Sequence, residues 1–367
     1  MKIKSVFLFF LCSVAFLSCI KDDEPLNREA DIESFTFESD KFIATNINDN
    51  NKLVTILMNR GVDLVNLAPD IKITDGATVE PASGVAGDFT DTVYYTVTSQ
   101  DKNWQKKYKV IVDILTVNDT IHYDFEDWHT EGNAPRNYPA LKDSWWSSAN
   151  SGVAIATSNI PRYPTESTTD AYKGNYAASL QTQRGLKVFG LFLTPVFSGS
   201  LYRGEFKLQG GNFLKSVRFG QIHAKESGKP IHFKGYYKYK PGDDYYYYDQ
   251  DKKTETIIPG EVDECSIYSV VYKVTKGAEG VKEYLDGTNV QTSDKIIAKA
   301  IWTDGTAKEQ YTEFSVPFTY TEEPDYDKYD YKLAVVFASS KKGDFYSGAV
   351  GSTLVVDEVS IICEPYE

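Results

Sequence analysis

LAVVFASSKKGDFYSGAVGSTLVVDEVSI, from Leu333 to Ile361, places two apolar runs on either side of a loop of small and polar residues. Both runs are short and rich in valine, and turn residues bound them, a combination that predicts buried β-strands. Similar runs recur upstream: VFGLFLT, LYRGEFKL, HFKGYYKYKP and CSIYSVVYKV. Convincing amphipathic helix is nearly absent, so residues 121–367 are expected to form one all-β unit.

So many strands in one unit imply two packed sheets, most simply a jelly-roll β-sandwich. A unit of this length can bury a large core without disulfides. If HFKGYYKYK is a strand, Phe233, Tyr237 and Tyr239 fall on one face, and the residues between them fall on the other.

Residues 31–116 carry a second series of short β runs, KLVTILM, DTVYYTVTS and KKYKVIVDIL, separated by turn-rich pieces. In the last run Tyr108, Val110, Val112 and Ile114 alternate onto one face. This rhythm predicts a small immunoglobulin-like sandwich, whose expected role is that of a spacer. TVNDT, from Thr116 to Thr120, is the expected link to the larger domain.

MKIKSVFLFFLCSVAFLSC opens the chain with two lysines before an apolar run that is too short to span a membrane comfortably. This pattern predicts a signal peptide over residues 1–18. Its end, FLSC, resembles a lipobox, so Cys19 is the expected lipidation site and residues 19–30 the expected tether. The alternative is an ordinary secretory signal with a chance cysteine. The acidic run IKDDE that follows resembles the surface-export signal of lipoproteins in gut Gram-negative bacteria.

These features predict an outer-membrane lipoprotein that is exposed at the cell surface and touches the membrane only through its lipid. Without the leader, the chain has 37 Lys and Arg against 52 Asp and Glu, a net charge of −15. Phosphate backbones require clustered basic side chains, so this balance argues against nucleic acid and other polyanions as partners. Neutral partners fit better.

Cys265 and Cys363 are the two cysteines that remain beyond the leader and Cys19. In an oxidising compartment they could form a disulfide, and two buried thiols in separate strands are the equal alternative. The chain has only four His and no Cys pair at metal spacing, so a zinc site has no support.

Two stretches resemble the PCMD family, a carbohydrate-metabolism domain found in lipoproteins of gut Gram-negative bacteria. In that family an F-G strand leads into a G-x-Y-K-Y strand, and these motifs fall here on Phe219–Gly220 and Gly235–Tyr239. A loop beginning S-S-K-x-G-D leads into a final G-S-x-L-x-V-D strand, here Ser339–Gly348 and Gly351–Asp357. The resemblance spans nearly all of Tyr123–Glu364. It implies an immunoglobulin-like domain followed by a jelly roll similar to carbohydrate-binding modules and some glycosidases.

Sugars present flat C–H faces edged by hydroxyl groups, so aromatic rings and amide, carboxylate or Arg side chains are their expected partners. DSWWSSAN places Trp145 and Trp146 side by side ahead of Asn150. Neighbours in an extended segment point to opposite faces, so both can be buried only if the chain turns there or both faces are covered. We expect one ring in the core and the other beside Asn150 at the ligand site.

Arg218, Lys234 and Tyr236 are further candidate ligand contacts, because strand parity places them on the outer faces of their strands. The alternatives are an ion pair for Arg218 and a cover for lysine stems for Tyr236. Lys342 and Asp344 are candidates in the glycine-rich loop, since loops over a rigid sandwich often bind ligands. The alternative there is a tight turn in which Asp344 caps backbone amides.

Asp357 shares strand parity with apolar residues, which is unusual for an acid. A buried carboxylate is costly unless an Arg, backbone amides or a metal meets it. Similarity to carbohydrate-binding jelly rolls implies a structural Ca²⁺ between the first and last strands, with Glu126 as the matching ligand. Alternatively, Glu126 faces water. No other cofactor is expected.

A glycosidase needs two carboxylates across a cleft. Asp124 with Glu126, or Asp357 with Glu358, could form such a pair, but no motif fixes their separation, and GxSxG, P-loop and HExxH motifs are absent. We therefore expect a surface lipoprotein that binds a polysaccharide or oligosaccharide beside an outer-membrane glycan importer. The alternatives are a glycoside hydrolase and a structural or adhesive surface protein.

Overall fold

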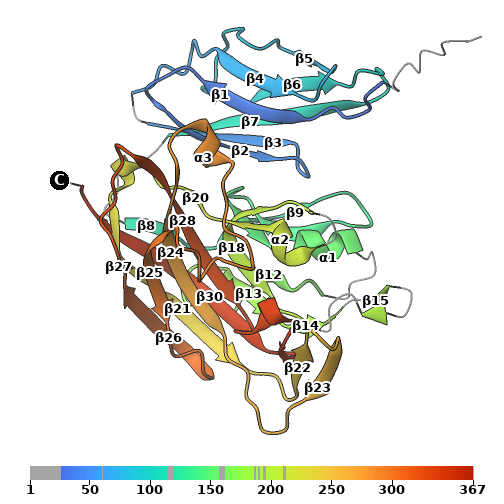
Figure 1. Cartoon of the computed structure of the whole chain (residues 1–367), viewed down its shortest axis with the longest axis vertical. Helices are drawn as coiled ribbons and strands as arrows, with labels where there is room; N and C mark the ends of the chain where they lie inside the picture. Colours follow the sequence, from blue (N-terminus) through green and yellow to red (C-terminus); the bar gives the residue numbers. More distant parts are fainter. Residues whose placement is uncertain are drawn as a thin grey trace, which may run out of the picture.

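The computed structural model describes residues 26–59, 61–114, 120–156, 162–185, 187–188, 191–192, 196–209 and 212–366. The expected leader, Cys19 and all but the last residue of TVNDT lie outside these ranges. Within them, no helix is long and apolar enough to cross a membrane. The chain forms two β domains, the smaller one at the top of Figure 1 and the larger one below it.

The smaller domain is a β-sandwich of two sheets, one antiparallel and one mixed. Its strands are β1 (Ile32–Phe37), β2 (Phe42–Asn48), β3 (Leu53–Met58), β4 (Pro69–Ile73), β5 (Thr78–Glu80), β6 (Val93–Thr98) and β7 (Gln105–Ile114). β1 pairs with β4, and the other five strands form a sheet in the order β2-β3-β7-β6-β5. Phe35, Val54, Tyr95 and Tyr108 are buried in the core, which confirms the predicted immunoglobulin-like sandwich.

The larger domain consists mainly of two sheets. One has eight strands: β11 (Trp146–Ser148), β18 (Ser200–Phe206), β28 (Tyr329–Ala338), β24 (Ser266–Thr275), β25 (Ile296–Trp302) and β27 (Thr319–Tyr320), with β19 (Val217–Phe219) on β18 and β20 (Gln221–Ile222) on β28. The other has six: β12 (Thr165–Thr168), β13 (Ala177–Gln181), β30 (Thr353–Glu364), β21 (Lys229–Lys240) and β26 (Lys308–Pro317), with β8 (Thr120–Tyr123) on β30.

Shorter elements surround these sheets. They are the pairs β9 (Trp128–Glu131) with β10 (Tyr138–Leu141), β14 (Gln183–Arg184) with β17 (Val196–Phe197) and β15 (Lys187–Val188) with β16 (Leu191–Phe192), and the group β22 (Tyr245–Asp249), β23 (Thr254–Ile257) and β29 (Gly348–Ala349). The helical turns are α1 (Asn150–Ala156), α2 (Phe213–Ser216), α3 (Ala278–Val281), η1 (Lys225–Ser227) and η2 (Gly343–Phe345).

The main core lies between the two large sheets and confirms the parity expected for β21. Phe233, Tyr237 and Tyr239 are buried, whereas the residues between them, apart from Gly235, are half-buried on the outer face. Cys265 and Cys363 are buried at this core as thiols, with no disulfide between them. The thiol alternative therefore holds, and the disulfide does not.

His223 gives the fold a pH dependence. Its ring is buried, and Nε2 donates a hydrogen bond of 2.7 Å to the Gly228 carbonyl. Burial lowers the pKa of His223 to about 4, because a charged imidazolium would lose its hydration. In the unfolded chain this histidine has its ordinary pKa near 6.5, so as the pH falls the unfolded state binds more protons than the folded state and gains stability relative to it. We expect acidification from pH 7 to 4 to cost about 3 kcal/mol through this group.

Urea unfolding of the wild-type protein and of His223→Gln at pH 7, 6 and 5 measures this effect. Glutamine can keep a donor near the Gly228 carbonyl but does not titrate, so the stability of His223→Gln should fall less steeply with acid. Parallel pH profiles for the two proteins would contradict the assignment.

Candidate ligand-binding site between the domains

The two domains meet through buried polar contacts around Ser144. The Asn46 side-chain amide donates to the Ser144 carbonyl at 3.0 Å, and the Thr55 and Ser144 hydroxyls lie 2.6 Å apart. All three side chains are buried. The Trp145 indole N–H adds a contact of 3.5 Å to the Asp113 carboxylate of β7. Because these groups exclude water and satisfy one another, the smaller domain has a defined position on the larger one.

Next to this contact lies a pocket of about 120 Å³ that both domains line. The smaller domain contributes Asn46–Asn50, at the end of β2 and the turn that follows. The larger domain contributes residues of β9, β10, β11, α1, β12 and β18, and the segment that follows β18. Pockets between domains, with a few convergent polar groups on aromatic walls, are common ligand-binding sites.

Four aromatic residues of the larger domain line the pocket: Trp128, Tyr138, Trp146 and Phe206. Trp146 is fixed by edge-to-face contacts with Tyr123 and Phe125, at centroid distances of 5.1 and 5.4 Å. The Trp128 indole N–H donates to the Phe125 carbonyl at 2.7 Å, and its side chain is only half-buried. A flat ring held in this way can offer its face to a sugar at little entropic cost.

Three carboxylates also line the pocket: Asp49 from the smaller domain, and Glu131 and Glu205 from the larger one. Glu205 accepts a hydrogen bond of 2.6 Å from Arg218, and Glu131 lies 3.4 Å from His129. The Asn51 side-chain amide donates to Glu131 across the domain boundary. Oxygen acceptors therefore face the pocket from both of its walls.

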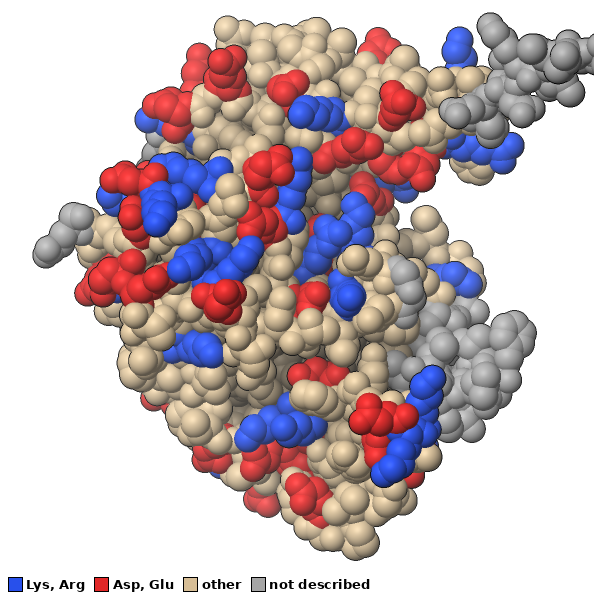
Figure 2. Space-filling model, in the orientation of Figure 1, with Lys and Arg blue, Asp and Glu red and all other residues tan. Residues whose placement is uncertain are grey.

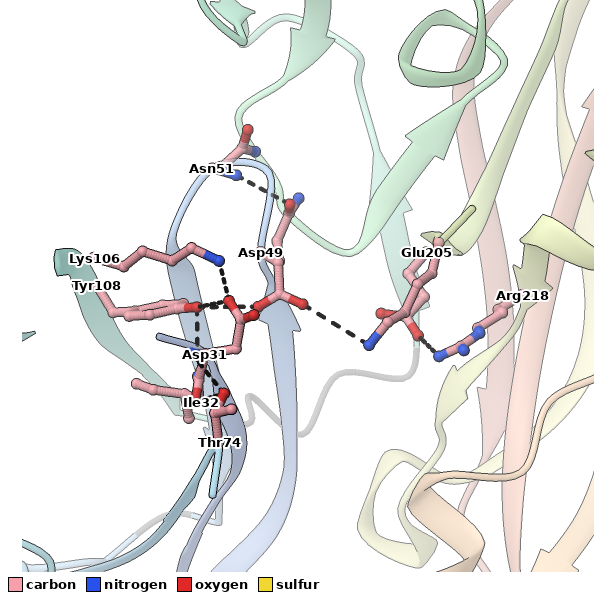
Figure 3. Close-up of polar contacts among 11 residues, drawn as sticks. Asp31, Ile32, Asp49, Asn51, Thr74, Lys106, Tyr108, Glu205 and Arg218 are labelled. Carbon is pink, nitrogen blue, oxygen red and sulfur yellow. Dashed lines mark hydrogen bonds and ion pairs between the residues drawn. The ribbon is translucent and has the colours of Figure 1, made fainter. Parts of the chain in front are cut away.

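Asp49 is held from behind by a charged cluster, which Figure 3 shows on the opposite side from the Glu205–Arg218 pair. The Tyr108 hydroxyl lies 3.0 Å from Asp31 and 3.2 Å from Asp49, and Lys106 pairs with Asp31. Burial raises the pKa of Asp49, and Lys207, 3.8 Å away, opposes that shift. Such an acid takes up a proton more readily than an exposed one.

The two adjacent tryptophans are both buried, 6% exposed for Trp145 and 7% for Trp146. The expectation that one packs in the core is confirmed for Trp146, which also lines the pocket. The expected ligand-facing position of the other beside Asn150 is wrong, because Trp145 packs at the domain contact. Asn150 is fully buried: it donates to the Pro139 carbonyl at 2.8 Å and accepts from the Thr165 N–H at 3.0 Å, so it positions pocket walls.

Of the predicted outer-face candidates, Arg218 lies apart from Lys234 and Tyr236, which share one face of β21. Arg218 forms the expected alternative, an ion pair, and reaches the pocket only through Glu205. Tyr236 stacks on Tyr172 with centroids 3.7 Å apart, on the outer face of the six-stranded sheet. Lys234 is half-buried on that same face of β21.

Asp344 lines a second cavity, and Lys342 lies between two residues that line it. This cavity of about 160 Å³ is mostly apolar, and Tyr202, Tyr268 and Val336, one residue from each of three adjacent strands, are among the side chains that line it. Asp344 lines it, and burial raises the pKa of this carboxyl. Lys342 lies over the Phe345 ring at 5.5 Å and is exposed. Because its lining is mostly apolar, this cavity suits a sugar less well than the interdomain pocket does.

The carboxylates predicted as candidate calcium ligands or catalytic groups do not line this pocket. Asp357 is fully buried and accepts the backbone N–H groups of Tyr172 and Lys173, at 2.8 and 3.0 Å. Glu126 accepts those of Asn175 and Tyr176, at 2.8 and 3.1 Å.

An Arg, backbone amides or a metal were the possible partners of a buried acid, and Asp357 has backbone amides. Asp124 accepts the Glu126 N–H, and Glu358 pairs with Lys173 at 3.1 Å. In the part of the chain that the structure describes, no three His, Cys, Asp or Glu side chains form a group that could hold a metal. Glu126 and Asp357 do not fit a shared calcium ion, because N–H donors occupy their oxygens, so we propose no calcium site.

Comparison with known proteins identifies the families that the two domains of this chain match. Residues 123–362 match the family described as "Putative carbohydrate metabolism domain", and residues 32–112 match the domain described as "SGBP, N-terminal". No curated protein is significantly similar to the chain.

Two solved structures from Bacteroides are similar. A putative glycoside hydrolase from Bacteroides thetaiotaomicron VPI-5482 is 32% identical, with a TM-score of 0.75 over 94% of this chain and 99% of that one. A putative glycoside hydrolase from Bacteroides vulgatus ATCC 8482 is 27% identical, with a TM-score of 0.56 over 66% of this chain and 98% of that one. The match over residues 123–362 shows that this chain belongs to the Putative carbohydrate metabolism domain family.

Proposed function

We propose that this protein binds glycans and that an oligosaccharide occupies the pocket between its two domains. The observation that carries the proposal is the lining of the pocket, where Trp128, Tyr138 and Trp146 face the same space as Asp49, Glu131 and Glu205. Aromatic faces match the C–H faces of a sugar ring, and carboxylates accept hydrogen bonds from its hydroxyl groups. An SGBP-type N-terminal domain and a carbohydrate-metabolism domain support the same class of ligand.

The proposal includes a place of action. A lipid on Cys19 would hold the protein in the outer membrane, with both domains at the cell surface, where it would pass glycans to an importer. Basic and acidic side chains are interspersed on the face in Figure 2, which suits a neutral ligand better than a polyanion.

Titration calorimetry on the chain that follows Cys19, with a panel of neutral oligosaccharides, tests the proposal. For any glycan that binds, Trp128→Ala should weaken affinity about tenfold or more, because it removes the half-buried ring that lines the pocket. Glu264→Gln is the control, since this residue lies outside the pocket and its side chain pairs with Lys341 at the surface. Unchanged affinity in Trp128→Ala would contradict the pocket, and no binding across the panel would favour an adhesive or structural role.

A glycoside hydrolase is the second candidate, because three carboxylates share one pocket and burial raises the pKa of Asp49, as a general acid requires. The description of the 32% identical relative agrees. Product analysis on the calorimetry mixtures separates the two. Intact oligosaccharide after prolonged incubation supports binding alone, whereas shorter products that disappear in Asp49→Asn support hydrolysis.

A further inference from the structure

A loop on the outer face of the six-stranded sheet is held by two carboxylates, the buried Asp357 and the half-buried Glu126. Asp357 is 0% exposed, and its Oδ2 accepts the N–H groups of Tyr172 and Lys173, while Oδ1 accepts that of Glu358. A buried carboxylate is tolerated only when such donors replace its hydration. The molecule thus uses a fully buried acid to fix the position of Tyr172.

Glu126 fixes the other end of the same loop through the N–H groups of Asn175 and Tyr176. Gly174 has φ of +75°, and a Cβ atom there would lie 2.0 Å from Glu126 Oε1. Only glycine allows this close approach. Phe125, next to Glu126, and Glu358, next to Asp357, both have positive φ, so the backbone is strained beside each anchoring acid.

The rigid loop presents an aromatic surface. Tyr172 is 46% exposed and lies flat on Tyr236 of β21, with ring centroids 3.7 Å apart and planes 11° apart. Tyr311 of β26 contacts the edge of this pair, 5.6 Å from Tyr172, and its hydroxyl donates to the Asp170 carbonyl. Three segments that are distant in the sequence therefore build one stacked group with an exposed ring on top.

Two ion pairs border this group, and Glu313 of β26 lies opposite Tyr236 as a further carboxylate. Lys238 lies 2.6 Å from Asp170 and 5.1 Å from the Tyr311 ring centroid, and Lys173 lies 3.1 Å from Glu358. These ion pairs and the Glu313 carboxylate supply hydrogen-bonding groups at the rim, which suit a neutral partner that carries hydroxyl groups.

We propose that Tyr172, supported by Tyr236 and Tyr311, is a second glycan contact, which stacks on the C–H face of a sugar ring in a neutral oligosaccharide. None of these three residues lines the interdomain pocket. The inference rests on the proposed function in its ligand class, and it adds a separate site. Because Asp357 and Glu126 order the loop in advance, the sugar meets a ring that loses little freedom on binding.

The test is titration calorimetry of the chain that follows Cys19 with neutral hexasaccharides of glucose, xylose and mannose. We expect Tyr172→Ala to lose one class of sites, or to weaken its affinity five- to tenfold, and Tyr172→Phe to bind like the wild type, because stacking needs the ring and not the hydroxyl. Tyr247→Ala is the matched control, since Tyr247 is 50% exposed on β22 and lies in neither site. Thermal melts establish that each variant is folded.

The two proposals fail differently. If Trp128→Ala weakens binding and Tyr172→Ala leaves stoichiometry and affinity unchanged, the outer contact is wrong and the pocket stands. If Tyr172→Ala alone weakens binding, the outer contact stands and the pocket is wrong. Equal effects of Tyr172→Ala and Tyr247→Ala would also overturn the outer contact. If the wild-type protein binds none of the hexasaccharides, both are wrong.

Discussion

Trp146→Ala is expected to lower the free energy of unfolding of the larger domain by about 3–5 kcal/mol, the usual cost of removing a large buried aromatic ring. Trp146 contacts Tyr123 and Phe125 edge-to-face and lies 6.2 Å from the Phe337 ring. Its neighbours come from different sheets and cannot close the gap together, so a cavity would remain. Urea unfolding followed by far-UV circular dichroism measures the change.

Trp145→Ala is the matched variant, because the two rings are equally buried but lie in different surroundings. Trp145 packs at the domain contact and bonds to Asp113, so its loss should loosen the smaller domain and leave the core of the larger one packed. We expect a smaller loss of stability than in Trp146→Ala. Equal losses in the two variants would contradict the different roles assigned to the two rings.

Asp263→Ala is expected to cost about 3 kcal/mol, because four donors would lose one acceptor. Asp263 is 2% exposed: Oδ2 accepts from the Ser340 and Ser352 hydroxyls and the Ala349 N–H at 2.6 to 2.8 Å, and Oδ1 accepts the Glu264 N–H at 2.9 Å. Burial raises the pKa of this carboxyl, and these hydrogen bonds oppose the shift. The carboxylate ties both ends of the loop between β28 and β30.

Glu264→Gln controls for this prediction as well, because the neighbouring Glu264 lies at the surface and its ion pair with Lys341 should contribute less than 1 kcal/mol. Thermal unfolding of both variants supplies the comparison, and limited proteolysis reports whether the loop opens. An Asp263→Ala protein as stable as Glu264→Gln, with an intact loop, would contradict the role given to Asp263.

Strand content, the two sandwiches and the parity of β21 were predictable, because the period of two in a half-buried strand leaves a strong mark on the sequence. The tryptophan pair shows where parity stops. Trp145 lies in a turn, where its N–H donates to the Asp143 carboxylate, and only Trp146 begins β11. The rule that neighbours oppose each other does not apply across a turn, so both rings could be buried.

The candidate site was much harder to predict. Glu131 and Glu205 face a pocket whose other wall, Asn46–Asn50, belongs to a separate domain, and no local pattern shows which surfaces two domains bring together. The apolar neighbours of Asp357 along its strand do predict a buried acid there. Asp263 was missed because it precedes β24 in an irregular segment, where no periodicity distinguishes a buried acid from an exposed one.

The shared pocket also bears on how relatives of this protein could diverge. The smaller domain lines the pocket with the end of β2 and the turn between β2 and β3. Turns accept substitutions and insertions that strands do not. β8 pairs with the last strand, β30, so the first and last strands of the larger domain lie side by side in one sheet, and the domain can be inherited as a unit. Evolution could therefore change ligand preference by altering one hairpin, or by recombining the smaller domain, while the jelly-roll core is conserved.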